Sequence, residues 1–174
     1  MIRDPRERGR SLAEFFRIVG PQLFRDLEDA GLVDPRGPAG EHARAEWECF
    51  ALYACVRGLV AAGGFGSETM EAVDSLHEAV AERWRLEGAD PERLAARRAR
   101  VAARYSEYGG IGQSAGSNAA LAARGLAEAA ARHMAEPASA APELVETVGA
   151  LHESLAEGAA EAVRRAGRDG TPEA

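Results

Sequence analysis

Hydrophobic residues recur every three or four positions along most of this chain, which is the pattern of amphipathic helices packed on a core. The clearest such stripe ends at Gly88 and consists of Met70, Val73, Leu76, Val80 and Trp84. No segment alternates β-branched and polar residues, so no sheet is expected. We therefore predict an all-α, single-domain bundle of about six helices.

Capping residues and helix breakers divide the first half of the chain. Ser11 and Glu14 form a capping box that opens the first helix, and Gly20-Pro21 is expected to kink or break it before Gly31. The second helix spans about 41–62. It is apolar nearly all round between Trp47 and Val60, which predicts a buried central helix.

Four more helices follow in the second half. They are predicted from Ser67 or Thr69 to Gly88, from Asp90-Pro91 to Gly109-Gly110, from Asn118 to Ala135, and over about 143–166. The bundle domain is accordingly 11–166, with a flexible N-terminus over 1–10 and a disordered tail over 167–174. Trp47 and Trp84 lie on the two strongest apolar faces and are expected to be buried.

The amino-acid composition supports a helical fold and excludes some classes of function. The chain has 38 alanines and only 6% aromatic residues, and alanine is the best helix former. All 21 basic residues are arginine, which we interpret as the codon bias of a GC-rich, bacterial genome. The net charge of −7 argues against nucleic-acid binding, which favours a basic excess. No motif requires a cofactor.

Neither a signal peptide nor a membrane span is expected. The first residues are charged rather than apolar, and no apolar run approaches the ~20 residues that a transmembrane helix needs. Cys49 and Cys55 are six residues apart in one predicted helix, so they point to different faces and cannot form a disulfide with each other. Two buried, reduced thiols indicate a cytoplasmic protein.

Two segments of the chain resemble each other. Residues 68–82 and 143–157 share eight identical positions of fifteen, including a Leu-His-Glu run in each. This is either chance convergence of two amphipathic helices or a duplicated helix pair, 41–88 and 117–166. A duplication would relate the two Leu-His-Glu runs by a pseudo-two-fold axis.

The histidines of these two runs are the candidate metal ligands. His77 and His152 each follow a core leucine, and Asp74 precedes His77 by three residues on the same helical face. Bundle di-iron sites use Glu-x-x-His from two helices, but Gly149 stands where the second acid would be. The alternative is a pair of hydrogen-bonded histidines at the edge of the core.

A row of arginines marks one face of the fourth predicted helix. Arg93, Arg97, Arg100 and Arg104 fall within about 60° of arc on an ideal helix. Such a row could hold an acidic protein, a phosphate ligand or an RNA backbone. The alternative is a solvated face paired with glutamates of the same chain.

A Gly/Ser-rich stretch, Gly109 to Ser117, follows this row. We expect a loop there, and a loop of this kind before a helix N-terminus can bind an anion, although it can also be a plain connection. Combined with the arginines, it suggests one anion site at the junction of helix and loop. The candidate residues are Arg100, Arg104, Tyr108, Ser114 and Ser117.

No signature of a known enzyme class occurs in the chain. The last predicted helix has a wide apolar face, with Leu144, Val148, Leu151 and Leu155 on one side, which favours self-association. The expected function is therefore that of a non-catalytic helical binding or interaction protein that forms a homodimer. The alternative is a small-ligand- or metal-binding bundle enzyme that uses the histidines or the anion site.

Overall fold

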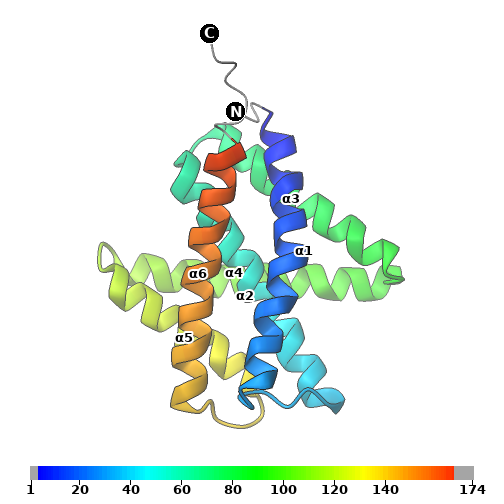
Figure 1. The fold of residues 1–174 in the computed structure, drawn as a ribbon, viewed down its shortest axis with the longest axis vertical. Helices are drawn as coiled ribbons and strands as arrows, with labels where there is room; N and C mark the ends of the chain where they lie inside the picture. Colours follow the sequence, from blue (N-terminus) through cyan, green and yellow to red (C-terminus); the bar gives the residue numbers. More distant parts are fainter. Residues whose placement is uncertain (1–3, 167–174) are drawn as a thin grey trace.

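The protein is an all-α bundle, as the hydrophobic pattern predicts (Figure 1). The computed structural model describes residues 4–166, and the predicted disordered tail lies outside them. Its elements are α1 (Pro5–Asp29), α2 (Gly37–Gly63), α3 (Ser67–Leu86), α4 (Pro91–Ala115), α5 (Ala119–Ala135) and α6 (Pro142–Ala166). Within 4–166 no strand occurs.

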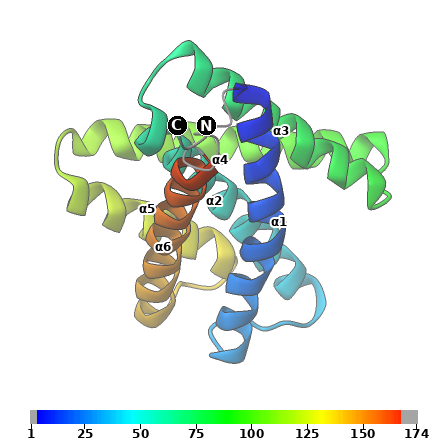
Figure 2. The ribbon, with the colours of Figure 1, turned by 45° about the horizontal axis from the view of Figure 1, so that its top comes forward.

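Helix α2 is the centre of the bundle, as predicted from its all-round apolar sequence. It packs against each of the other five helices, and Trp47, Phe50 and Cys55 are almost fully buried along it. Trp84 of α3 is buried as well, at 4% exposure. In Figures 1 and 2, α1 and α6 lie side by side in front of α2.

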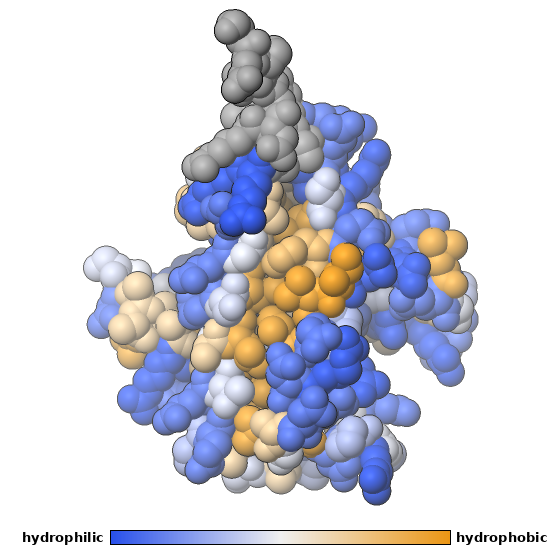
Figure 3. Space-filling view, viewed as in Figure 1, coloured by the Kyte–Doolittle hydropathy of each residue, from blue (hydrophilic) through white to orange (hydrophobic). Residues whose placement is uncertain are grey.

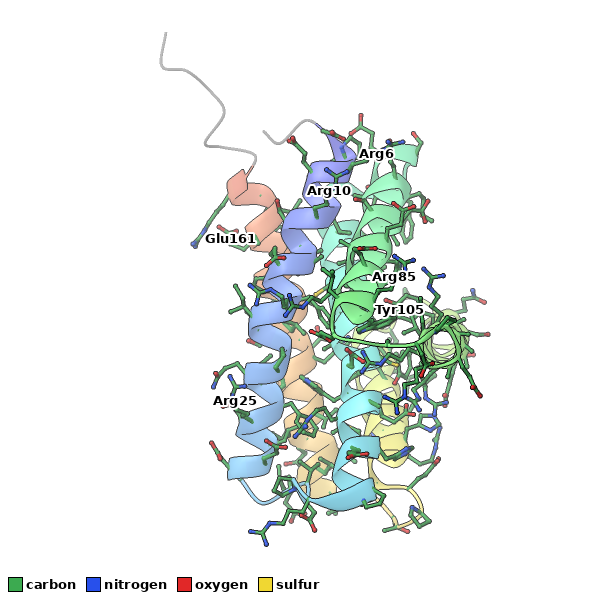
Figure 4. All side chains as sticks on the ribbon, turned by 90° about the vertical axis from the view of Figure 1, so that its right-hand side faces the viewer. Arg6, Arg10, Arg25, Arg85, Tyr105 and Glu161 are labelled. Carbon is green, nitrogen blue, oxygen red and sulfur yellow. The ribbon has the colours of Figure 1, made fainter. Side chains whose placement is uncertain are left out.

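Helix α4 runs across the other helices rather than along them. Figure 4 shows it nearly end-on, while α1, α2 and α6 are seen from the side. Asp90 caps its start by accepting a hydrogen bond from the Arg93 backbone N–H at 2.8 Å, with Pro91 at the first helical position. The cap and the proline confirm the predicted start of this helix.

The α2–α6 pair is packed almost backbone to backbone. A Cβ atom added to Gly58 of α2 would lie 2.6 Å from the Ala159 Cβ atom and 2.8 Å from the Ala156 carbonyl oxygen of α6. Only glycine fits there, and only small residues fit opposite it. The α2–α6 packing therefore depends on these three positions.

The prediction for the first helix is wrong at two places. Residues 5–10 are helical rather than flexible, because the Asp4 side chain caps the Arg6 backbone N–H at 2.9 Å and Pro5 follows the cap. Helix α1 also continues through Pro21 without a break. Pro21 is solvent-exposed, and the preceding Gly20 carbonyl accepts a hydrogen bond from the Trp47 indole at 2.8 Å, which holds this part of α1 against α2.

The predicted end of the fourth helix is also wrong. Helix α4 does not stop at Gly109-Gly110 but continues to Ala115, and Gly116 (φ 58°) ends it. Tyr108 is fully buried, and the Ile111 side chain lies so close to Gly125 of α5 that a Cβ atom there would meet it at 2.9 Å. This packing outweighs the helix penalty of about 1 kcal/mol per glycine.

Among residues 4–166, no helix combines the length and apolar character needed to cross a bilayer.

Candidate functional site

A cleft of about 470 Å³ lies between α3 and α4. Apolar side chains from three helices form its walls, among them Leu52, Val80, Val101 and Trp84. Five polar side chains also line it, namely Asp74, His77, Glu78, Arg98 and Tyr105. A mainly apolar cleft with a few converging polar groups is the usual form of a small-molecule site.

His77 and Tyr105 meet across this cleft, where Figure 4 labels Tyr105 beside the end of α3. The His77 Nε2 atom and the Tyr105 hydroxyl are 3.0 Å apart. The His77 ring also hydrogen-bonds the Val73 backbone, and burial lowers its pKa below the ordinary value. The ring is therefore neutral at pH 7. Either the Tyr105 hydroxyl or the His77 ring can donate the proton of their hydrogen bond, depending on the tautomer of the ring.

His152 occupies a different environment on the other side of the same aromatic cluster. It is 1% exposed and stacks on Phe50 with ring centroids 3.8 Å apart. Neither ring nitrogen makes a hydrogen bond of normal geometry, although the Phe50 backbone lies close enough to favour the charged form. Burial lowers the pKa of His152 to about 3, with Arg57 adding to the effect.

The predicted metal site does not assemble. Within the part of the chain that the structure describes, no three His, Cys, Asp or Glu side chains form a group that could hold a metal ion. Aromatic rings stand between His77 and His152: Tyr105 contacts His77, and Tyr53 contacts both Tyr105 and His152. Asp74, His77 and His152 are therefore not ligands of one ion. The duplication of the two helix pairs stays a prediction.

Two arginines of the α4 row, Arg100 and Arg104, face a buried carboxylate of α2. Glu46 is 2% exposed, and Arg104 grips it with two hydrogen bonds, Nε to Oε2 at 2.6 Å and Nη2 to Oε1 at 3.1 Å. Arg100 adds an ion pair at 3.4 Å. The hydrogen bond to Glu46 raises the pKa of Arg104. Both carboxylate oxygens are thus paired with arginine inside the fold.

The same network extends from α4 to α5. The Glu107 carboxylate is hydrogen-bonded to His133 Nε2 at 2.7 Å and also forms an ion pair with Arg132. The second His133 ring nitrogen lies 3.2 Å from Glu136, and His42 of α2 contacts the His133 backbone carbonyl at 2.8 Å. These contacts join α2, α4 and α5 by charge as well as by apolar packing.

The structure does not bring together the five residues of the predicted anion site. Because α4 continues to Ala115, Arg100 and Ser114 are separated by about 21 Å of helix at 1.5 Å per residue. Arg100 and Arg104 are turned toward Glu46, Tyr108 is fully buried, and Ser114 and Ser117 are exposed. The five residues cannot converge on one small anion.

Sequence reasoning missed the partner of the arginines. Glu46 stands just before the apolar run of α2. An acid at the edge of an apolar run on a buried helix was the signal that could have indicated a buried carboxylate. It could have been matched with the arginine row of α4, since a buried carboxylate requires a cation. The cleft residues Glu78, Arg98 and Tyr105 carried no signal beyond their helical spacing.

No family model, curated protein or solved structure matches this chain. The candidate site therefore depends on geometry alone.

Replacing Glu46 by glutamine should destabilise the protein by about 3 kcal/mol, because Arg104 then keeps its charge in a mostly buried position with only the longer ion pair to Glu107, at 3.9 Å, to neutralise it. Urea denaturation gives the free energy of unfolding. The matched control is Glu128→Gln, which removes a carboxylate whose partner Arg124 is 77% exposed. That change should cost at most about 1 kcal/mol. Equal losses in the two variants would refute a structural role for the Glu46 pair.

Stability should fall on mild acidification because of His152. Its folded-state pKa of about 3 lies below the unfolded value near 6.5, so the unfolded chain binds a proton that the folded protein does not. The contribution is complete above pH 6.5 and is lost as the pH falls toward 3. Between pH 7.5 and 5 the loss should be about 2 kcal/mol. The His152→Leu variant lacks this contribution, so between pH 7.5 and 5 its free energy of unfolding should fall by about 2 kcal/mol less than that of the unchanged protein. Parallel curves would contradict the assignment, and the comparison separates His152 from His77.

Proposed function

We propose that this protein is a non-catalytic binding protein that holds a small, mainly apolar ligand in the cleft between α3 and α4. The observation that carries the proposal is the cleft itself, with apolar walls around one hydrogen-bonded His–Tyr pair. Its volume of about 470 Å³ falls in the usual range of small-ligand sites. The ligand would contact Leu52, Val80 and Val101.

Binding is favoured over catalysis by the protonation states of the nearby nucleophilic groups. Burial raises the pKa of Cys55 to about 12, and burial with neighbouring carboxylates does the same for Cys49. Burial also raises the pKa of Tyr105 well above its ordinary value. These groups stay protonated at pH 7, whereas a nucleophile of this type is activated by a lowered pKa or an adjacent base. Tyr105 forms a hydrogen bond with His77, but its raised pKa keeps it in the phenol form at pH 7.

Filling the cleft should abolish binding. Ala102 lines the cleft and is solvent-exposed, so Ala102→Trp adds a large side chain at its edge without burying it in the core. The uncharged fluorescent probe N-phenyl-1-naphthylamine should bind the unchanged protein, and Ala102→Trp should weaken it about tenfold or more. The control is Ala103→Trp, also exposed but outside the lining. Equal probe affinity in both variants would refute the cleft as the binding site.

A second proposal is self-association through the face formed by α1 and α6. Figure 3 shows an apolar strip running over these two helices. Ile18 of α1 is 60% exposed, and Phe15 beside it lies against Gly158 of α6. The apolar side of α6 from which we predicted self-association packs inside the protein, since Leu144, Val148 and Leu155 are buried. The exposed strip now supports a homodimer instead.

Ile18→Glu should convert a dimer into a monomer, because it places a charge on the exposed apolar side of α1. Light scattering at micromolar concentration gives the mass. Met70→Glu is the matched control, since Met70 is similarly exposed, at 55%, but lies on α3. A monomer mass for the unchanged protein would remove the proposal.

We also infer a bacterial, cytoplasmic origin. The inference draws on the arginine-only basic residues and on two buried free thiols.

A further inference from the structure

We propose that the cleft between α3 and α4 binds apolar molecules that carry a hydroxyl group, and that this hydroxyl forms a hydrogen bond with Tyr105. This inference rests on the proposed function and names the ligand class of the same site. The observations that carry it are the burial of the polar groups in the lining and the hydrogen-bonding capacity of Tyr105.

The polar groups of the lining differ in burial. Asp74, Glu78 and Arg98 are solvent-exposed, so they stay hydrated when the cleft is occupied, and an ion pair with an exposed charge contributes little. They also carry charges of both signs. His77 and Tyr105 are partly buried, so a bound ligand would exclude water from them. We therefore assign recognition of the ligand's polar group to this pair.

The Tyr105 hydroxyl is held in a fixed position. It lies 3.0 Å from His77 Nε2. The Tyr105 ring packs edge-on against Tyr53 of α2, with ring centroids 5.2 Å apart, and against the His77 ring at 5.4 Å. Burial raises the pKa of Tyr105 well above its ordinary value, so the group is a neutral hydroxyl at pH 7. A ligand in the cleft therefore meets a preformed, uncharged hydrogen-bonding group.

This hydroxyl keeps hydrogen-bonding capacity beyond its bond to His77. Among residues 4–166, His77 is the one side chain that forms a hydrogen bond with it. If Tyr105 donates the shared proton, its oxygen lone pairs stay free to accept; if His77 donates it, the phenolic proton stays free to donate. Once a ligand has displaced water, leaving that capacity unused costs binding free energy.

A hydroxyl on the ligand fits both arrangements of the shared proton. It donates to the Tyr105 oxygen in the first and accepts the Tyr105 proton in the second. An ammonium group can only donate and a carboxylate can only accept, so each fits one arrangement. Both would also lose hydration between the apolar walls formed by Leu52, Val80 and Val101. A ligand without a polar group fits neither arrangement.

The test compares octan-1-ol with 1-fluorooctane, which has the same length but forms no strong hydrogen bond. Each competes with the N-phenyl-1-naphthylamine probe on the full chain at pH 7. Tyr105→Phe removes the hydroxyl and keeps the ring, so it should weaken octan-1-ol about fivefold, which is the usual contribution of one hydrogen bond. The affinity for 1-fluorooctane should not fall.

Tyr53→Phe is the matched control. It removes a hydroxyl from the same aromatic cluster, but Tyr53 does not line the cleft. The variant should bind octan-1-ol and 1-fluorooctane as the unchanged protein does.

A second measurement follows the unchanged protein directly. Octan-1-ol should shift the ¹⁵N resonances of the His77 ring, because the Tyr105 hydroxyl connects the ligand to that ring. 1-Fluorooctane should shift them much less. The chain has four histidines, and His77→Gln identifies the resonances that belong to His77.

The outcomes separate the two proposals. If Tyr105→Phe weakens both molecules equally or neither, if the probe binds but octan-1-ol does not, or if octan-1-ol leaves the His77 resonances unmoved, recognition of a hydroxyl is overturned and the cleft remains a binding site. If neither the probe nor either molecule binds, the proposed function fails, and recognition of a hydroxyl fails with it.

Discussion

A carboxylate buried at the edge of an apolar helix face has to be neutralised inside the protein, and Glu46 sets this requirement at the centre of the bundle. Leaving an ion unpaired there would cost several kcal/mol. Its cation comes from Arg104 on α4, at 2.6 Å. Helix α4 must therefore pass close to α2 at this point, and Figure 4 shows that it does so while lying across α1, α2 and α6. The cleft lies on the other side of α4, between it and α3.

The same ion pair also positions the chemistry of the cleft. Successive residues of an α-helix are rotated by about 100°, so Tyr105 projects to the side of α4 next to the face that Arg104 occupies. That side is the one toward α3, where Tyr105 meets His77. Two aromatic residues of α2, Phe50 and Tyr53, then pack between the crossing helix and the buried His152. The structural ion pair and the candidate binding site are consequently neighbouring faces of one helix.

Local signals in the sequence predicted much of this fold, but features that depend on residues far apart in the chain could not be predicted from it. Asp90-Pro91 and the apolar stripe of α3 are local patterns: the first placed the start of α4 correctly, and the second placed the buried face of α3 correctly except at Met70, which is 55% exposed. The end of α4 was missed because three glycines weaken the helix locally, whereas Tyr108 and Ile111 stabilise it through contacts with other helices. The arginine row was recognised, but its partner lies 58 residues earlier along the chain. His77 was singled out, but its spacing could not identify Tyr105 as its neighbour.

The backbone contact at Gly58 also constrains how the length of the chain could vary. One residue inserted into α6 ahead of Ala156 would rotate the helix beyond it by about 100°. The small face made by Ala156 and Ala159 would then turn away, and bulkier side chains would face Gly58 where no Cβ atom fits. An insertion of the same length between α5 and α6 leaves this match intact. A change of chain length next to α6 can therefore be accommodated in the connection over 136–141 but not in the part of α6 ahead of Ala156, which is fixed in residue count as well as in composition.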